Sequence, residues 1–339
     1  MNKIKDALNI ASHLNLIRIA NLFRLKSSYF IAKWFKFNFH QGKPFSLSIE
    51  PTTACNLGCP ECPSGLKQFT RPTGKLTTQL NEQILNQVHK HVFYINYYFQ
   101  GEPFLNPNFL DLIKQAKEKK IYTATSTNGH FISKQTAKNI VESKLDRLII
   151  SIDGLTEETY TNYRVHGNLN KVLEGAKHII EAKKELKSAT PHVIFQFLVV
   201  KQNEHEIDQI IQLGKEMGAD EVRLKSAQVY DYEHGNPLIP ENSKYARYKK
   251  QKDGTYRLKW KLGNHCWRMW SSCVFTWDGR VVPCCFDKDA SFQLGRLENN
   301  NFSQIWNSEK YNAFRQNILK NRNEISICKN CSEGAKVWI

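Results

Sequence analysis

Residues 45–62 read FSLSIEPTTACNLGCPEC, and this stretch decides the class of fold. Its first eight residues form a β-rich run. The cysteines follow at once in the pattern Cys-x3-Cys-x2-Cys, at Cys55, Cys59 and Cys62. Short β-rich runs bounded by small and polar residues are typical of strands. The stretch therefore predicts a strand whose carboxyl end carries a loop of metal-ligating residues.

Strands and helices alternate regularly from this stretch to residue 229. The β-rich runs are residues 45–52, 93–100, 121–127, 147–152, 192–200 and 221–229. Segments of helical period lie between them, at residues 78–92, 108–119, 133–143, 171–187 and 204–217, and Asn203 with Glu206 predicts a capping box at the start of the last one. This alternation predicts an α/β fold with a parallel sheet and right-handed crossovers. Six units are too few for a closed eight-stranded barrel, so we expect a partial (β/α)6 TIM-like barrel or a doubly wound sheet.

Small and polar residues follow the next three strands, as the cysteines follow the first. They are Gly101-Glu102-Pro103, Ser126-Thr127-Asn128-Gly129 and Ser151-Ile152-Asp153-Gly154. Any one of these turns would be ordinary in a purely structural sheet. In parallel α/β folds, however, the loops at the carboxyl ends of the strands build the ligand site. Their joint placement with three cysteines predicts one site at this rim.

The composition is that of an ordinary globular protein. The chain has 339 residues, of which 41% are apolar and 24% charged, and Lys, Arg or Asn interrupts every hydrophobic stretch. A membrane-spanning helix needs roughly 18 unbroken apolar residues, so none is expected. Forty-eight Lys and Arg against 32 Asp and Glu give a formal charge of +16, which suits an anionic partner. Solvated helix faces explain most of this excess, and no RNA-binding module is recognisable, so a nucleic-acid partner is not expected.

The nine cysteines are clustered rather than spread along the chain. Three lie within residues 55–62 and six after residue 265, with a long cysteine-free segment between the groups. Their number is odd, and the N-terminus has no signal-peptide cleavage pattern, so a secreted disulfide scaffold fits poorly. Clustered thiols in a reducing, cytoplasmic compartment are typical metal ligands.

The first 44 residues differ from the rest of the chain. They contain eight basic residues and one acid, Asp6, which gives a net charge of +7. Apolar residues recur at near-helical spacing from Ile4 to Leu22, and aromatic residues interleaved with Lys follow, up to Phe39. Two interpretations stay open. A basic amphipathic helix can lie in a membrane interface, which would make the protein membrane-associated, or it can pack across the main domain, which we favour.

Three thiolates on one loop can reach a single metal or cluster, but they are one ligand short of a closed tetrahedral site. An iron–sulfur cube held by three thiolates keeps one iron free to bind another molecule. The alternative is a structural zinc site whose fourth ligand, Cys or His, comes from another segment.

In its spacing, its position and the surrounding barrel pattern, the cysteine loop resembles that of the radical S-adenosylmethionine (radical SAM) enzymes, whose signature is Cys-x3-Cys-x2-Cys after the first strand. The resemblance implies that Cys55, Cys59 and Cys62 hold a [4Fe-4S] cluster. It further implies that S-adenosylmethionine chelates the open iron through its methionyl amine and carboxylate. A flavodoxin- or ferredoxin-like partner would then deliver the electron.

The same resemblance assigns a role to the loop after the second strand. Gly101, Glu102 and Pro103 look like the family's Gly-Gly-Glu-Pro element, which holds the methionyl ammonium, with Glu102 as the acid. Two positions depart from the family pattern. Glu61 stands where an aromatic residue usually precedes the third cysteine, and Gln100 replaces the first glycine, which leaves that turn less flexible.

The loops after strands three and four look like further contacts to S-adenosylmethionine. Ser126 and Asn128 resemble the residues that bind the ribose. Ser151 with Arg164 resembles the pair that holds the methionyl carboxylate, and the guanidinium fork of Arg suits a carboxylate.

The C-terminal segment contains a second set of cysteines. They fall in the pattern Cys266-x12-Gly279-x4-Cys284, followed by Cys328-x2-Cys331. Asp278-Gly279 between β-rich flanks predicts a hairpin that brings Cys266 and Cys284 onto adjoining strands. From their spacing alone, the four thiolates suit a zinc knuckle and an iron–sulfur cluster equally well.

This pattern resembles the shortened SPASM, or "twitch", module of many radical SAM enzymes, which carries one auxiliary [4Fe-4S] cluster. The resemblance implies that Cys266, Cys284, Cys328 and Cys331 hold that cluster. Cys273 and Cys285 stay unassigned; we expect both in the core, with Cys285 a substitute ligand at most. The expected parts are an extension over 1–44, a barrel over 45–232, a linker over 233–265 and a small iron–sulfur domain of β-hairpin and helix over 266–339.

The resemblance implies an oxidoreductase that cleaves S-adenosylmethionine reductively to a 5′-deoxyadenosyl radical, which takes a hydrogen atom from the substrate. Four cysteines leave the auxiliary cluster no open iron, so it would accept an electron from the substrate radical. The outcome would be dehydrogenation of a small molecule, glycan or lipid-linked substrate. A SPASM-type peptide or protein maturase and a non-catalytic scaffold with two zinc sites are the alternatives. Oxidation also needs a proton acceptor, for which the candidates are Lys225, Tyr230, Asp231 and His265.

Overall fold

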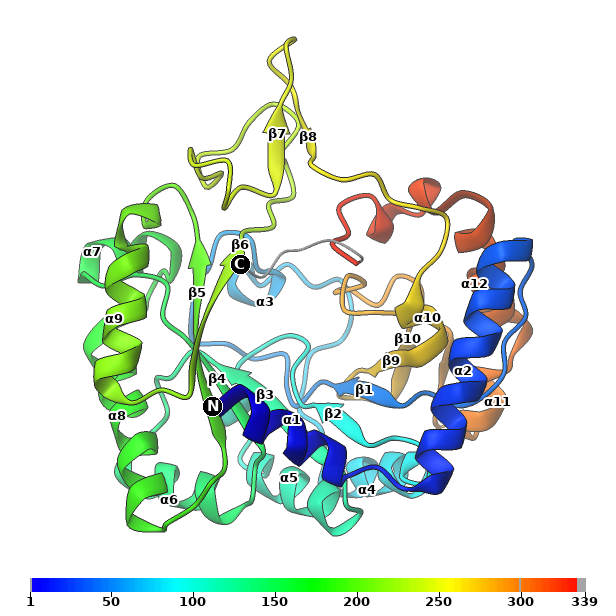
Figure 1. Cartoon of the computed structure of the whole chain (residues 1–339), viewed down its shortest axis with the longest axis horizontal. Helices are drawn as coiled ribbons and strands as arrows, with labels where there is room; N and C mark the ends of the chain where they lie inside the picture. Colours follow the sequence, from blue (N-terminus) through cyan, green and yellow to red (C-terminus); the bar gives the residue numbers. More distant parts are fainter. Residues whose placement is uncertain (1, 299, 334–339) are drawn as a thin grey trace.

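A computed structural model describes residues 2–298 and 300–333. The first residue of the predicted extension and the last six of the predicted iron–sulfur domain, residues 334–339, lie outside it. Six parallel strands form the wall of an open barrel (Figure 1). The strands are β1 Ser46–Ile49, β2 Tyr94–Asn96, β3 Tyr122–Thr127, β4 Arg147–Ser151, β5 His192–Val199 and β6 Glu221–Ser226. They pair in chain order, which confirms the predicted α/β fold with a partial barrel.

Helices cover the outside of the barrel; five of them correspond to the predicted helical segments, and the one at residues 157–163 was not predicted. They are α4 Thr78–Val88, α5 Phe109–Glu118, α6 Lys134–Glu142, α7 Glu157–Tyr163, α8 Leu169–Glu185 and α9 Ile207–Met217. Each of the longer ones turns an apolar stripe to the sheet; α5, for example, buries Phe109, Leu112, Ile113 and Ala116. The large core between helices and strands holds the barrel wall in shape.

The capping box predicted for α9 is wrong. The Asn203 side chain donates to the backbone carbonyls of Asp153 and Leu198, each over 2.9 Å, instead of capping the helix. Glu206 accepts hydrogen bonds from the amide of Leu155 (2.9 Å) and the hydroxyl of Thr159 (2.8 Å). Both side chains therefore bind the loop after β4, which is a tertiary role that local spacing does not reveal.

The strands β1, β2 and β6 end earlier than the β-rich runs predict. The chain leaves the sheet at Ile49, Asn96 and Ser226, and the remaining residues of each run lead into the loops of the rim. The predicted site loops are therefore longer, and the sheet shorter, than the residue composition alone indicates.

The sheet continues beyond the barrel into the C-terminal segment. Strand β9 (Ser272–Phe275) pairs with β1 in parallel, with Cys273 opposite Leu47, and β10 (Arg280–Val282) and β11 (Gly295–Arg296) follow in antiparallel pairing. The result is one nine-stranded sheet in the order β11-β10-β9-β1-β2-β3-β4-β5-β6. The barrel and the C-terminal segment thus share backbone hydrogen bonds.

The predicted hairpin at Asp278-Gly279 joins β9 to β10, and Gly279 has a φ of 81°, which suits the turn. The expectation that Cys266 lies on the adjoining strand is wrong. The short helix α10 (Trp267–Ser271) separates Cys266 from β9, so Cys266 stands before a helix rather than on a strand. Cys284 follows β10 closely, as expected.

The remaining C-terminal elements are helical, and the predicted linker contains a small sheet. The helices are α11 Phe302–Trp306, α12 Glu309–Asn321 and the 3-10 turns Arg322–Glu324 and Ser326–Cys328. Within residues 233–265, β7 (Tyr248–Lys250) and β8 (Tyr256–Leu258) form an antiparallel hairpin that projects from the barrel (Figure 1).

The N-terminal extension forms two helices, α1 (Asn2–Ser12) and α2 (Leu16–Phe35), and both pack against the rest of the molecule. Helix α1 contacts the start of the barrel strands, where Asp6 forms an ion pair with Arg147. Helix α2 runs along the C-terminal segment, where the Tyr29 ring lies 5.2 Å from that of Trp267. The packing interpretation therefore holds for one side of the helix pair.

Candidate active site

The cysteine loop lies between β1 and the short helix α3 (Pro63–Leu66), at the carboxyl end of the first strand. The Cys62 amide donates to the Cys59 carbonyl over 3.2 Å, which closes a tight turn. A Cβ at Gly65 would lie 2.7 Å from the Cys59 amide nitrogen, so only glycine lets α3 pack this closely on the loop. Burial, and then the neighbouring Glu102 and the other two cysteines, raise the pKa of Cys55 to about 11.

Gly101 locks the loop after β2 onto the cysteine loop. Its φ is 73°, and a Cβ there would collide with the Thr52 carbonyl and lie 2.8 Å from that of Ala54. The Gly101 amide donates to the Ser64 hydroxyl (2.9 Å). Gln100 can replace the first glycine of the family's element because the backbone there does not have a positive φ. Its side-chain oxygen accepts a hydrogen bond from the same Ser64 hydroxyl (3.4 Å).

Glu102 joins the loops that follow β2 and β3. Its carboxylate accepts hydrogen bonds from the Asn128 amide (2.7 Å), the Thr127 hydroxyl (2.8 Å) and the Phe104 amide (3.2 Å). Burial raises the pKa of Glu102 to about 7, although these three hydrogen bonds oppose the shift. A buried carboxylate of this kind is a suitable partner for an ammonium group.

The predicted ribose and carboxylate contacts lie on neighbouring strands of the same rim. Asn128, directly after β3, donates from Nδ2 to Asn56 Oδ1 over 2.7 Å and so reaches the cysteine loop. Ser126 is the penultimate residue of β3, and Ser151 is the buried last residue of β4. The structure thus brings Asn128 into contact with the cysteine loop and places Ser126 and Ser151 near the same strand ends.

Arg164 follows α7 and reaches the cysteine loop. Its Nε and Nη2 atoms each lie 2.6 Å from Asp153 Oδ2, and Nη1 lies 3.7 Å from Cys59 Sγ. Asp153 also accepts from the Leu198 amide (2.7 Å), which fixes the carboxylate on the rim. The sequence places Asp153 in the Ser-Ile-Asp-Gly turn after β4 but gives no signal that it pairs with Arg164.

Glu61, the departure from the family's aromatic position, makes a different contact. Its carboxylate accepts from the Tyr230 amide (2.9 Å) and from Asn236 Nδ2 (3.4 Å). The side chain therefore ties the cysteine loop to the segment after β6. Burial raises the pKa of Glu61, and the hydrogen bonds to both partners counter that rise.

A buried ion pair beside the cysteine loop has no signal in the sequence. Arg71 donates from Nη1 and Nη2 to the two carboxylate oxygens of Glu50, over 2.8 and 2.6 Å. Arg71 Nε also donates to the Lys288 carbonyl (3.0 Å), and Glu50 accepts from the Trp277 amide (3.3 Å). The pair connects β1, the segment after α3 and the C-terminal hairpin.

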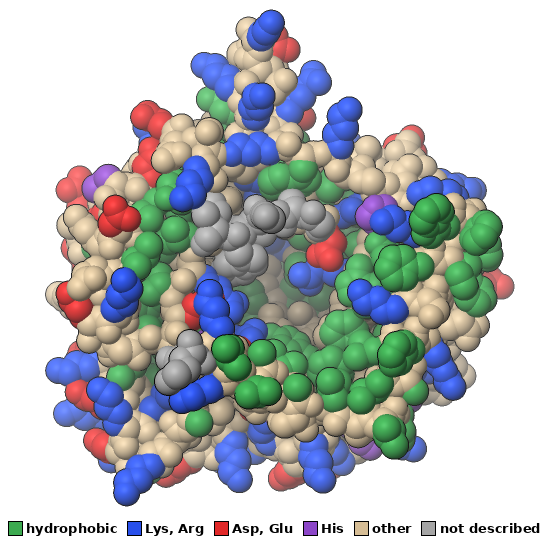
Figure 2. Space-filling view, in the orientation of Figure 1, with side chains coloured by type: hydrophobic (Ala, Val, Ile, Leu, Met, Phe, Trp, Pro, Cys, Tyr) green, Lys and Arg blue, Asp and Glu red, His purple; other side chains and the backbone are tan. Residues whose placement is uncertain are grey.

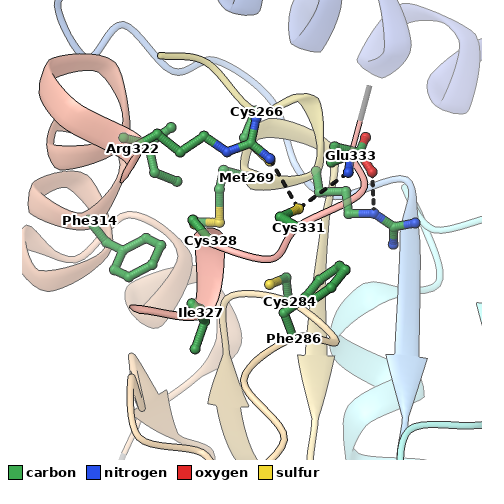
Figure 3. Close-up of a pocket in the computed structure, with 12 residues that line it drawn as sticks. Cys266, Met269, Cys284, Phe286, Phe314, Arg322, Ile327, Cys328, Cys331 and Glu333 are labelled. Atoms are coloured by element: carbon green, nitrogen blue, oxygen red, sulfur yellow. Dashed lines mark hydrogen bonds and ion pairs between the residues drawn. The ribbon is translucent and has the colours of Figure 1, made fainter. Parts of the chain in front are cut away.

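The four cysteines predicted to hold the auxiliary cluster line one pocket of the C-terminal segment (Figure 3). They are Cys266, Cys284, Cys328 and Cys331, which come from the residue before α10, the loop after β10 and the turn that ends the described chain. The Cys331 amide donates to the Cys328 carbonyl over 3.1 Å, so the Cys-x2-Cys pair forms a tight turn. The structure therefore brings together the whole predicted set.

Hydrogen-bond donors already surround one of these sulfurs. Cys331 Sγ accepts from Arg322 Nη2 (3.1 Å) and from the Glu333 amide (3.3 Å), as Figure 3 shows. Such bonds to a ligating sulfur stabilise the thiolate and tune a bound cluster. Cys273 is 2% exposed on β9, as expected for a core residue, while the partly buried Cys285 packs near Val282 and lines no part of this pocket.

The donor set fits iron–sulfur binding at both positions. Burial raises the pKa of Cys266 to about 12 and that of Cys328 to about 11, so these thiols lose their protons readily only when a metal binds them. In residues 2–298 and 300–333, no three His, Cys, Asp or Glu side chains are arranged to hold one metal ion. An iron–sulfur cube does not require that arrangement, because each thiolate binds a different iron.

The four candidate proton acceptors lie in different surroundings. His265 contacts the hydroxyl of Tyr29 over 2.9 Å and so faces the N-terminal extension. Tyr230 and Asp231 are exposed to solvent. Desolvation, reinforced by the nearby Arg247, lowers the pKa of Lys225 to about 8, which brings its amine toward the range where it can accept a proton at neutral pH.

Comparison with protein families identifies the chain. Residues 49–214 match the Radical SAM superfamily, and residues 266–332 match SPASM, an iron-sulfur cluster-binding domain. The chain belongs to the radical SAM enzymes, which bind a [4Fe-4S] cluster and S-adenosylmethionine. More particularly, it is a radical SAM enzyme with a C-terminal SPASM domain, the domain that binds auxiliary iron–sulfur clusters. The alternative of a non-catalytic zinc scaffold is thereby excluded.

One related protein is the tungsten-containing aldehyde ferredoxin oxidoreductase cofactor-modifying protein of Pyrococcus furiosus. It is 25% identical over 313 residues, which cover 84% of this chain and 86% of the relative.

Solved structures share the fold at low sequence identity. SuiB of Streptococcus suis bound to S-adenosylmethionine is 17% identical with a TM-score of 0.63, over 91% of this chain and 76% of SuiB. The enzyme anSMEcpe with AdoMet and the Cp18Cys peptide is 18% identical with a TM-score of 0.60, over 87% and 91%. BtrN with AdoMet and 2-DOIA is 17% identical with a TM-score of 0.53, over 86% and 94%.

Proposed function

We propose that this protein is a radical SAM oxidoreductase that dehydrogenates a non-peptide substrate and uses one auxiliary [4Fe-4S] cluster as electron acceptor. The pocket lined by four cysteines carries the proposal. Four thiolates complete the protein ligation of one cluster, so no iron is left for the substrate. A cluster closed in this way can still exchange electrons, which is what the oxidation of a substrate radical requires.

Each predicted site residue has a proposed task at the barrel rim. The proposed assignments are the first cluster to Cys55, Cys59 and Cys62, the methionyl amino group to Gly101, Glu102 and Pro103, the ribose to Ser126 and Asn128, and the methionyl carboxylate to Ser151 and Arg164. The cluster and S-adenosylmethionine, once bound, supply the radical that removes hydrogen from an unactivated carbon. The chain orients the cofactor through these contacts and keeps water away from it with buried rim loops.

Two observations favour a small, non-peptide substrate, a glycan or a lipid-linked compound over a peptide. The first 44 residues pack against the barrel and the C-terminal segment, and so do not form a separate peptide-recognition module. The relative from Pyrococcus furiosus has a name that describes modification of a cofactor rather than of a peptide. A flavodoxin- or ferredoxin-like protein in the cytoplasm is the electron donor we propose.

Variants of the two cysteine sets test the cluster assignment. Protein purified without air should hold about eight irons and no zinc, and it should release 5′-deoxyadenosine under a strong reductant. Replacing Cys55, Cys59 and Cys62 by Ala should leave about four irons and abolish nucleoside release. Replacing Cys266 and Cys284 by Ala should also leave about four irons but preserve nucleoside release while removing product formation. Cys273→Ala, a buried cysteine outside both sets, should keep all the iron.

The decisive product is a candidate substrate that is lighter by two hydrogens. Product formation that survives the loss of the second cysteine set would contradict the role of the auxiliary cluster as electron acceptor. Zinc in the C-terminal pocket of protein made without air would contradict its assignment as an iron–sulfur site. Turnover of a peptide in place of small molecules would establish the maturase alternative.

A further inference from the structure

Helix α2 turns an apolar stripe to solvent. Leu16, Ile19, Phe23, Phe30 and Trp34 follow helical spacing along one face and are 84, 38, 70, 49 and 79% exposed. An amphipathic helix of a globular protein normally buries such a stripe and exposes its polar side. Here the buried face is partly polar, with Arg18, Asn21, Leu25, Ser28, Tyr29 and Ala32. The exposed stripe therefore requires an explanation other than core packing.

Polar anchors fix the helix in this orientation. Arg18 is 3% exposed and donates to the carbonyls of His89 (2.7 Å) and Lys120 (2.8 Å), both in the barrel. Asn21 exchanges two hydrogen bonds of 2.8 Å with the backbone of Lys43. Rotating α2 to hide its apolar stripe would break these bonds and leave a buried guanidinium unpaired, which is costly.

The stripe belongs to a wider surface, which we call the apolar face. It comprises Ile4 and Leu8 of α1, the five stripe residues of α2, and Phe35 at the end of α2. Ile4, Leu8 and Phe35 are 66, 64 and 72% exposed. Figure 2 shows hydrophobic side chains gathered over α1 and α2 on one side of the molecule. Exposed apolar patches of this extent mark a membrane or protein contact.

Basic residues border the apolar face, and their charge favours an anionic lipid surface over a second copy of the chain as its partner. At about 100° per residue, Lys26 and Lys33 lie along one flank of the stripe and Arg24 along the other. Lys26 also keeps its ammonium 4.3 Å from the Trp267 ring, so its stem lies beside the helix. A second copy of the chain would bring these cations against cations. An anionic lipid surface instead complements both the apolar stripe and the charged flanks.

We propose that α1 and α2 dock the enzyme onto an anionic phospholipid surface, with the apolar face in the interface between headgroups and acyl chains. Trp and Phe are typical of interfacial helices with basic flanks. No helix in the part of the chain that the structure describes is long and apolar enough to cross a membrane. The helix pair therefore lies on the bilayer and leaves the barrel outside it. The proposal is independent of the enzyme's substrate.

Vesicle flotation of the full-length, cluster-loaded protein tests the proposal. The probes are vesicles of phosphatidylcholine alone and of phosphatidylcholine with 30% phosphatidylglycerol. Binding should favour the anionic vesicles at least about tenfold and weaken as salt rises, because several cations contribute, each by roughly fivefold near a charged surface. Phe23→Ser with Phe30→Ser and Trp34→Ser should weaken binding about 100-fold, since three aromatic side chains no longer enter the interface.

Matched variants separate docking from folding. Leu186→Ser removes an apolar side chain that is 41% exposed at the C-cap of α8, outside the apolar face, and should leave binding unchanged. All variants should keep the iron content of the parent protein. Equal binding to both kinds of vesicle would overturn the anionic surface as the partner. Absence of vesicle binding, with a dimer in solution that the triple substitution separates, would assign the apolar face to a second copy instead.

Discussion

Glu102 illustrates how one carboxylate supports both the rim and the proposed chemistry. It holds the amide of Asn128 and the hydroxyl of Thr127 in place, and it is buried. Burial raises its pKa from an ordinary 4.5 to about 7. Glu102 is therefore charged above neutral pH, and the carboxylate is the state that best accepts hydrogen bonds from a methionyl amino group.

We predict that the affinity for S-adenosylmethionine falls as the pH drops below about 7, by up to about tenfold per unit, because protonation of Glu102 removes the charged acceptor of the methionyl amino group. Calorimetric titration at pH 6, 7 and 8 measures this, and Glu102→Gln should bind weakly at every pH. Equal affinities of the parent protein at pH 6 and pH 8 would refute the contact between Glu102 and the methionyl amino group.

The raised pKa of Glu102 also makes the stability of the folded protein depend on pH. Between about 4.5 and 7 the folded, cofactor-free protein binds more protons at Glu102 than the unfolded chain does, so its stability falls as the pH rises through this window. Glu102→Gln lacks this contribution. Denaturant titrations should therefore show that the parent protein loses unfolding free energy relative to Glu102→Gln between pH 5 and pH 7.5.

At the scale of residues, the sequence predicted what lies within one loop and missed what joins distant loops. Cysteine spacing is readable because chelation by a short loop depends on local separation. Glu61 looked like a lost aromatic contact, yet it binds the amide of Tyr230, far along the chain. The sequence predicts that Arg164 binds the methionyl carboxylate. Its ion pair with Asp153 becomes visible only in the structure.

At the scale of elements, the buried pair of Glu50 and Arg71 holds three segments around the cysteine loop. We predict that Arg71→Met destabilises the protein by about 3 to 5 kcal/mol, because it leaves the Glu50 carboxylate buried without its partner. Lys201→Met, which breaks the exposed pair with Glu241, should have no measurable effect. Denaturant unfolding of both variants provides the comparison, and similar losses in the two would contradict it.

The prediction of helices was correct where a hydrophobic period extends over several turns. It was wrong where only a few residues determine the local structure. The covering helices follow from their period, because each must bury a stripe on the sheet. Helix α10 is a single turn of five residues within a β-rich segment, too short to show a period, so Cys266 was expected on a strand. Asn203 matched a capping box, but its side chain binds the loop after β4 instead.

At the scale of the whole molecule, β9 completes one side of the barrel wall. We predict that a chain ending at residue 265 will aggregate, because removing β9 exposes the hydrogen-bonding edge of β1, which is an inner strand of the sheet. The readout is the soluble fraction on expression and the size of what remains in solution. A soluble, monomeric fragment would show that β1 does not depend on its C-terminal neighbour.

The sequence indicated a radical SAM barrel followed by a SPASM domain but not how the two connect. Residues 45–232 and 266–339 were expected as separate domains, since their cysteine patterns are separate, whereas β-pairing between distant strands leaves no local pattern. For residues 1–44, the helical period could not distinguish packing from a membrane contact. The structure shows why, since one face of α2 is packed and the other is exposed.

The pairing of β9 with β1 also bears on how such enzymes diversify. A SPASM domain transplanted from another enzyme would need cysteines at matching positions and, in addition, a strand whose register opposite Leu47 closes the barrel wall. The backbone hydrogen bonds between β9 and β1 take no part in catalysis. They nevertheless require the barrel and the SPASM domain to match each other, so few SPASM domains from other enzymes could replace this one.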